Sequence, residues 1–177
     1  RKSTPKVENL AQFVGSRQEL FARMVGDRFV VEVEAPAVEI PAHCESALLL
    51  QALSNLIQNA KESYPSGGGR IHIAVDREEI DDSVVDLTLG ASAGGYARIR
   101  VRDWGAGMTP DVLAHAFDPL FTTRSSSGHT GLGLSTVYGI IRSLDGFLTA
   151  ESQVGKGTTV SLYLPISTGE SSPGRAK

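Results

Sequence analysis

The first residues suited to ligand binding are Asp103, Gly105 and Gly107. They directly follow an alternating run at 96–102 that predicts a strand. A carboxylate only accepts hydrogen bonds, so at a strand end it suits a ligand amino group. Glycine tolerates backbone angles that other residues avoid, which lets the main chain approach a flat ligand closely. The same pattern also marks ordinary turns. Its function therefore depends on what accompanies it in the sequence.

Two asparagines form the second feature. Asn55 and Asn59 lie one turn apart on an expected helix over 45–64, opposite the apolar face that its helical periodicity defines. Asparagine is a poor helix former, so the pair is unexpected on a plain polar face. An amide oxygen is a hard ligand that suits Mg²⁺. We expect Asn59, and with it Asn55, to face a ligand; a solvated helix face is the alternative.

A third feature is the pair Gly131 and Gly133, which opens a further expected helix. Free N–H groups and the positive end of the helix dipole favour phosphate at such a position. The small, polar stretch at 122–130 is typical of a mobile loop that folds over a ligand. Together, the three features predict a purine ring at one end of a pocket and phosphates at the other. The sequence contains no Gly-x-x-x-x-Gly-Lys-Ser/Thr phosphate loop.

The bulk composition fits one domain with a proper core. The chain has 177 residues, 41% of them hydrophobic, and a net charge of -3, so no global basic field attracts nucleic acid or membrane. The single cysteine, Cys44, excludes an internal disulfide framework and fits a reducing cytoplasm. No apolar run reaches membrane-spanning length. Because the chain starts at Arg1 without Met, we expect a longer protein, in which any inner-membrane anchor lies outside this sequence.

Periodicity and turn residues predict an α/β two-layer sandwich, with a mixed, mostly antiparallel sheet and helices on one face. Strands are expected at 29–34, 70–75, 84–89, 96–102, 147–151 and 158–164, and helices at 10–25, 45–64, from 110 and over 131–144. Asn9 with Gln12 is the expected cap of the first helix, and Thr109 with Pro110 that of the third. We divide the chain into a linker and helical tail at 1–27, a ligand-binding domain at 28–165 and a flexible tail at 166–177.

Four motifs stand in a fixed order along the chain. They occupy 55–63, 103–108, 117–124 and 130–139. In this order they resemble the N box, first glycine box, F box and second glycine box of the catalytic, ATP-binding domain of bacterial sensor histidine kinases. This family lies within the wider group that includes gyrase B and MutL. The resemblance covers roughly 28–165 and implies the Bergerat ATP-binding fold. The last two motifs are most similar to those of nitrogen-regulation and hybrid kinases.

The resemblance implies ATP and Mg²⁺ as cofactors and gives roles to the matching residues. Asp103 would bond the adenine amino group, while Gly105 and Gly107 would shape the adenine pocket. Asn59 would coordinate Mg²⁺, and Asn55 would contact phosphate or support Asn59.

The loop residues also receive roles from the resemblance. Arg124 would reach the terminal phosphates. The loop and helix would approach the phosphates through Thr130, Gly131, Leu132 and Gly133. His129 stands where the family usually has the first glycine of this box, which leaves the hinge of the loop open.

The phosphoacceptor histidine of the family is not visible in this chain. None of its four histidines, His43, His72, His115 and His129, has the acidic neighbour and following proline of that motif. The resemblance thus implies the ATP-binding half of a kinase. Its partners would be a dimerisation and histidine-phosphotransfer domain of the same protein, and a response-regulator receiver domain. The isolated domain is expected to be monomeric and cytoplasmic, and the full protein a homodimer.

The choice between kinase and ATPase depends on Asn55. The ATPase branch of the wider group has a Glu at this position, one turn before the Mg²⁺ asparagine, as a general base for water. An amide cannot take a proton at neutral pH, so Asn55 favours a kinase. Two alternatives stay open: an ATPase, and a nucleotide-binding or interaction module without transfer activity.

Overall fold

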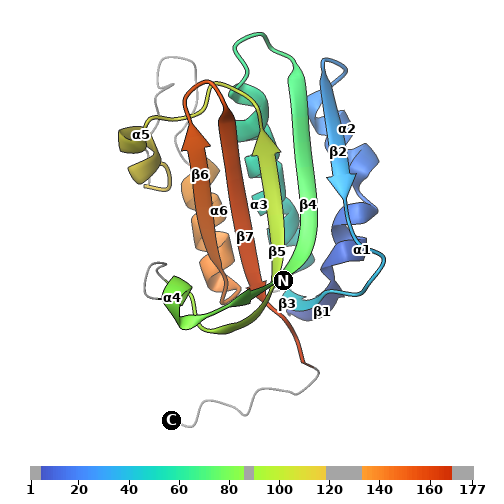
Figure 1. Ribbon diagram of the computed structural model, residues 1–177. Helices are drawn as coiled ribbons and strands as arrows, with labels where there is room; N and C mark the ends of the chain where they lie inside the picture. The colour runs from blue at the N-terminus through green and yellow to red at the C-terminus, as the bar shows by residue number, and fades with distance from the viewer. Residues whose placement is uncertain (1–4, 86–89, 119–132, 169–177) are drawn as a thin grey trace.

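The computed structural model describes residues 5–85, 90–118 and 133–168 (Figure 1). The strands are β1 (Lys6–Asn9), β2 (Phe29–Glu34), β3 (Pro41–Cys44), β4 (Gly69–Ile80), β5 (Gly94–Asp103), β6 (Phe147–Gln153) and β7 (Gly157–Pro165). The helices are α1 (Leu10–Gly15), α2 (Gln18–Val25), α3 (Ser46–Glu62), α4 (Asp82–Val85), α5 (Pro110–Ala114) and α6 (Gly133–Ser143). None of these described helices has the length and apolar character needed to cross a membrane.

Five strands form the main sheet, in the order β2-β4-β5-β7-β6. β2 runs parallel to β4, whereas the other three neighbouring pairs are antiparallel. In Figure 1, α1, α2, α3 and α6 lie behind this sheet, and α5 stands beside the β6 edge. The expected two-layer sandwich, with a mixed, mostly antiparallel sheet and its helices on one face, is therefore confirmed.

The main core fills the space between the sheet and these helices. Alternate residues of a strand point to the same face, and Ile71, Ile73 and Ile99 are fully buried on the helix side. From α3, the core receives Leu49, Leu53, Leu56 and Ile57. The helical spacing of these four residues is the periodicity that predicted α3 from the sequence.

The segment before residue 28 contributes to the same core. Leu10, Val14 and Phe21 of α1 and α2 are fully buried. β1 pairs antiparallel with β3, so the chain from residue 6 onward is attached to the domain. At the other end, Ser167 N–H donates to the Pro41 carbonyl at 2.8 Å. The domain boundaries at 27 and 165 in the full protein stay a prediction.

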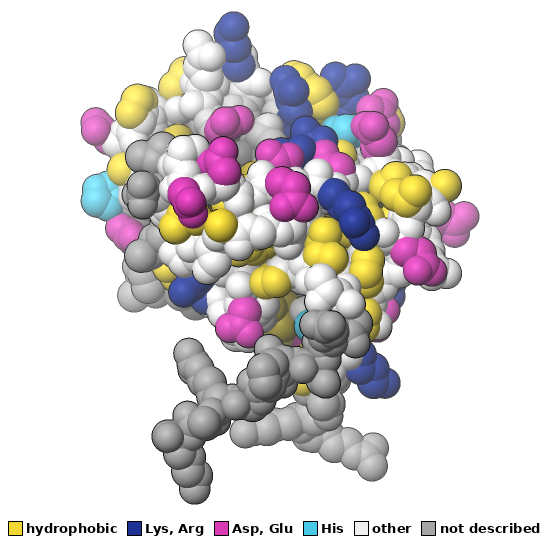
Figure 2. Space-filling view, turned by 60° about the horizontal axis from the view of Figure 1, so that its bottom comes forward, with side chains coloured by type: hydrophobic (Ala, Val, Ile, Leu, Met, Phe, Trp, Pro, Cys, Tyr) yellow, Lys and Arg dark blue, Asp and Glu magenta, His cyan; other side chains and the backbone are white. Residues whose placement is uncertain are grey.

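The opposite face of the sheet carries charges and a small aromatic cluster. Asp76 accepts hydrogen bonds from Arg98 and Arg100, all at 2.8 Å. Burial alone would raise the pKa of Asp76, but these two arginines hold it below its usual range. Phe147 and Tyr163 stack with ring centroids 4.3 Å apart. Figure 2 shows acidic and basic side chains interspersed on the surface seen from the lower end of Figure 1.

Local bonds explain two differences from the expected elements near the N-terminus. The helix expected over 10–25 is broken at Ser16 and Arg17, whose side chains both donate to the Phe13 carbonyl. Such bonds compete with continuation of a helix. Asn9 does not cap α1 with its side chain; instead, its Oδ1 accepts the Ile40 N–H at 3.1 Å. By contrast, the expected cap at Thr109 is confirmed, since its side chain accepts the Val112 N–H at 3.4 Å.

Between β4 and β5 the expected boundaries were also wrong. β4, expected to end at residue 75, continues to Ile80. Residues 84 and 85, expected to begin a strand, lie in α4, and 86–89 lie outside the described residues. Asp81 explains this local turn, because its Oδ1 accepts the Ser83 N–H at 3.0 Å. An acidic side chain that caps the next residues favours a helical turn over a strand.

Candidate functional site

The polar side of α3 holds one end of the site. Asn55 and Asn59 are both half-buried on this helix. The Nδ2 atom of Asn59 is buried, with no hydrogen-bond partner among the described residues. A β-carbon added to Gly133, at the start of α6, would lie 3.1 Å from that atom. The structure thus brings Asn59 and Gly133 together, as the sequence suggested.

A buried donor without a hydrogen-bond partner in the described part of the chain, such as Asn59 Nδ2, needs a structural explanation. Leaving a buried donor unsatisfied costs roughly 1–3 kcal/mol, and native proteins contain few such groups. A ligand at the polar side of α3 would supply the missing partner.

The other end of the site is formed by Asp103, the last residue of β5. The residue is only 6% exposed although it carries a carboxyl group. The Oδ1 atom accepts the Gly105 N–H at 2.9 Å and lies 3.0 Å from the Ser63 hydroxyl. A buried carboxylate held by two donors is a fixed acceptor, which suits recognition of a ligand N–H group.

The two glycines after Asp103 allow the turn to pack tightly against other segments. A β-carbon on Gly105 would lie 2.0 Å from the Ser63 hydroxyl oxygen, and one on Gly107 would lie 2.0 Å from the Gln153 carbonyl oxygen. Gly107 also has a φ of 69°, in the left-handed region that favours glycine. Both positions therefore require glycine, one by close approach and the other by close approach and backbone angle.

The end of α3 is bonded to this turn. Ala106 N–H donates to the Ser63 carbonyl at 2.8 Å, and Trp104 N–H donates to Tyr64 Oη at 2.7 Å. Tyr64 in turn donates to the Arg70 carbonyl on β4. Sequence reasoning missed both Ser63 and Tyr64. The available signal was a hydroxyl residue one turn after Asn59, followed by a helix-ending proline and glycines.

Two arginines flank the same turn on its outer side. The guanidinium carbon of Arg70 lies 3.9 Å from the ring centre of Trp104, and that of Arg102 lies 4.6 Å from it. Such cation–π contacts fix the indole as a packing group.

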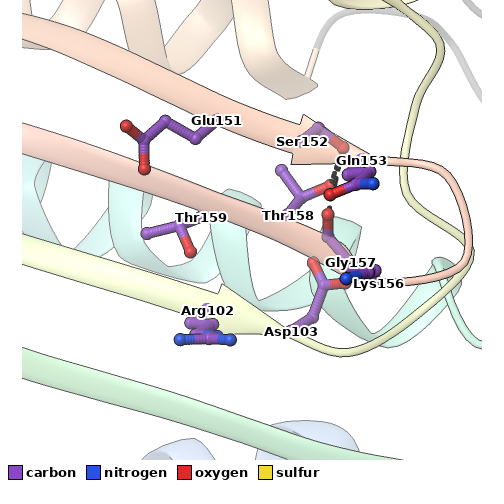
Figure 3. Close-up of a pocket in the computed structure, with 9 residues that line it drawn as sticks. All are labelled: Arg102, Asp103, Glu151, Ser152, Gln153, Lys156, Gly157, Thr158 and Thr159. Carbon is purple, nitrogen blue, oxygen red and sulfur yellow. Dashed lines mark hydrogen bonds between the residues drawn. The ribbon is translucent and has the colours of Figure 1, made fainter.

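A pocket of about 240 Å³ opens beside Asp103, where β5 meets the β6–β7 turn (Figure 3). The residues that line it are Arg102, Asp103, Glu151, Ser152, Gln153, Lys156, Gly157, Thr158 and Thr159. No residue of α3 lines this pocket. It therefore adjoins the Asp103 turn without including the asparagines.

Four of the expected site residues lie outside the described part of the chain: Arg124, Thr130, Gly131 and Leu132. Their roles stay predictions. Of the expected F box, Phe117 is described and packs half-buried against the core.

The residues present fit a Mg²⁺ ion that is held mainly by phosphates and water. Over 5–85, 90–118 and 133–168, no group of three or more His, Cys, Asp or Glu side chains could hold a metal by itself. Mg²⁺ usually keeps several waters and takes only one or two protein ligands beside substrate phosphates. A single amide at Asn59 is compatible with such a site.

Comparisons with known proteins identify the family of this chain. Residues 44–168 match the family described as histidine kinase-, DNA gyrase B- and HSP90-like ATPase. Sensor kinase CckA of Brucella abortus is 34% identical over 161 residues, which cover 91% of this chain and 17% of that protein. Sensor histidine kinase ZraS of Escherichia coli is 31% identical over 149 residues, covering 84% of this chain and 27% of that protein. The chain thus spans about a quarter or less of these relatives.

Solved structures confirm the fold. The mycobacterial sensor histidine kinase MprB superposes with a TM-score of 0.66 at 22% identity, covering 92% of this chain and 97% of that one. Full-length ShkA, solved in complex with AMPPNP, gives a TM-score of 0.67 at 21% identity, covering 95% of this chain and 32% of that one. From the family match and these relatives, the chain belongs to the histidine kinase-, DNA gyrase B- and HSP90-like ATPases, as an ATP-binding catalytic domain of the sensor histidine kinase type.

Proposed function

We propose that this domain binds ATP with Mg²⁺ and transfers the γ-phosphoryl group to a histidine on a separate phosphotransfer domain of the same protein. The observation that carries the proposal is the Nδ2 atom of Asn59, buried and without a partner among the described residues, beside Gly133 at the start of α6. The N-terminus of α6 adds N–H groups that favour phosphate. Asp103 contacts Ser63 directly after α3, where it would accept the adenine amino group.

In this proposal Asn59 holds the metal ion, and Asn55 contacts phosphate or supports Asn59. Mg²⁺, when bound, neutralises charge on the phosphates. The protein itself positions the nucleotide and stabilises the charge of the transferring group. Arg124 would add a positive charge near the terminal phosphates. Thr130, Gly131 and Leu132 would provide main-chain contacts to them.

The helix α3 also supports a kinase over an ATPase. Asn55, one turn before Asn59, has no proton-accepting group at neutral pH. Glu62, the nearest carboxylate after Asn59 on this helix, accepts a hydrogen bond from Gln58 Nε2 at 2.8 Å. In a histidine kinase the substrate imidazole is itself the nucleophile, so the domain needs no base for water. An ATPase or a nucleotide-binding interaction module remains the alternative function.

The cellular setting follows from the same proposal. The full protein would be a cytoplasmic or membrane-anchored homodimer that passes the phosphoryl group to a response-regulator receiver domain. No nucleic-acid partner is proposed. The isolated domain would be monomeric.

The direct test mixes the chain with candidate phosphotransfer domains and ATP labelled at the γ-phosphate. We expect label on histidine of one such domain only when Mg²⁺ is present, and loss of that label with Asn59→Ala. Glu39→Gln is a matched surface control that should transfer normally. Steady phosphate release by the isolated chain that disappears with Asn55→Ala would instead support the ATPase. Binding of nucleotide without transfer to any candidate would favour the interaction module.

A further inference from the structure

We propose that Ser63 is a positioning residue that fixes the Asp103 carboxylate and so determines selectivity for a 6-aminopurine. The inference rests on the proposed nucleotide site and adds a selectivity residue to it. Ser63 follows α3 directly as its C-terminal cap. Its hydroxyl oxygen lies 3.0 Å from Asp103 Oδ1 across 40 residues of sequence.

The Ser63 hydroxyl has one proton and two acceptors within reach. Besides Asp103 Oδ1, the Ala60 carbonyl oxygen lies 2.7 Å away. A carboxylate forms the stronger hydrogen bond because it is charged. Two oxygen atoms at 3.0 Å, one of them charged, would repel each other without a proton between them. The hydroxyl proton is therefore shared between the two acceptors, and the charge of Asp103 Oδ1 offsets its longer distance.

Two donors thus converge on one oxygen of the carboxylate. The Gly105 N–H reaches Oδ1 at 2.9 Å, in addition to the Ser63 hydroxyl. Together they restrict rotation of the carboxylate about its last side-chain bond. An acceptor that is already oriented loses less entropy and needs less reorganisation when a ligand amino group arrives. With Ser63 removed, the carboxylate would lose one of these two donors.

The position of Ser63 does not depend on its own hydroxyl. Its carbonyl accepts the Ala106 N–H at 2.8 Å, and the neighbouring Tyr64 accepts the Trp104 N–H at 2.7 Å. These bonds remain in Ser63→Ala. That substitution therefore tests the hydroxyl while the contact between α3 and the turn is kept.

Calorimetric titration of two ligands separates selectivity from general damage. The ligands are ADP and purine riboside 5′-diphosphate, which lacks the 6-amino group. We expect Ser63→Ala to weaken ADP binding about tenfold and to change binding of the purine analogue by no more than about twofold. Ser54→Ala is the matched control, because Ser54 on the same helix donates to the Leu50 carbonyl of its own helix, at 2.7 Å. It should leave both affinities unchanged.

The possible outcomes are distinct. Equal weakening of both ligands by Ser63→Ala, or unchanged ADP binding, would overturn the role of Ser63 while leaving the nucleotide site intact. A wild-type chain that binds neither ligand would contradict the proposed function itself. Ser63→Gly removes the same hydroxyl at a helix end, where glycine is tolerated. It should reproduce the selective loss, and replaces Ser63→Ala if thermal unfolding shows that variant to be unfolded.

Discussion

Gly105 and Ser63 are in such close contact that a β-carbon on Gly105 would lie 2.0 Å from the Ser63 hydroxyl oxygen and 2.6 Å from its carbonyl oxygen. Gly105 is not among the glycines with positive φ. Glycine is therefore needed at this position because of the approach of α3. The turn after Asp103 and the end of the asparagine-bearing helix form one packed unit.

Gly105→Ala should push the turn after Asp103 away from the end of α3. The new methyl group cannot be accommodated without moving the turn away from α3, and overpacking of this kind costs roughly 1–3 kcal/mol. We expect urea denaturation to show a free energy of unfolding lowered by about that amount, together with weaker ADP binding. Gly139→Ala, in α6 with no atom within 4 Å of the added β-carbon, is the control and should be neutral or slightly stabilising. Wild-type stability of Gly105→Ala would contradict the contact.

Helical and strand periodicity made much of the fold predictable. The span of β2 was predicted as observed, and α3 was predicted within two residues at each end. The pairing of β1 with β3 could not be predicted, because each strand has four residues and some thirty residues separate them. A period cannot be recognised in so short a run. The break at Ser16 and Arg17 depends on side-chain bonds that compete with the helix.

The sequence indicated which residues form the candidate site, but not which residues hold them in place. Asn59 and Asp103 were identified from residue type and spacing, and the structure places both beside the end of α3. Ser63 and Tyr64 act through contacts with residues 40 positions away in the sequence. Local sequence carries no information on such pairings. Only the tertiary structure shows that the same helix end contacts the carboxylate.

Asn59→Ala should separate stability from ligand binding. Removing a buried amide whose Nδ2 has no partner in the described structure relieves a desolvation cost, and alanine is the better helix former. We therefore expect a free energy of unfolding equal to or above that of the wild type. ADP binding should lose its Mg²⁺-dependent part and keep the rest. Equal loss with and without Mg²⁺, measured by calorimetry, would refute the proposed metal role.

Asp76→Asn should show a pH-dependent loss of stability. The pKa of Asp76 is lowered in the folded state, so its charged form contributes stability at pH values above the unfolded pKa of about 3.9. That contribution disappears as the pH falls through the folded-state value. We expect a deficit of about 1 kcal/mol near pH 7, reduced by partial exposure, which shrinks in acid. Glu39→Gln should show no such trend in the same denaturation series.

Cys44 should be nearly inert in the folded protein. It is fully buried, and burial, with a smaller effect from Glu8, raises its pKa to about 11. Because only the thiolate reacts, a raised pKa and lack of access both slow modification. We expect a chromogenic disulfide reagent at about pH 8 to label the native chain at least about a hundredfold more slowly than the urea-unfolded chain. Cys44→Ser should give no signal in either state. Equal rates in both states would show that the β1–β3 sheet and α1 open readily and leave this part of the core accessible.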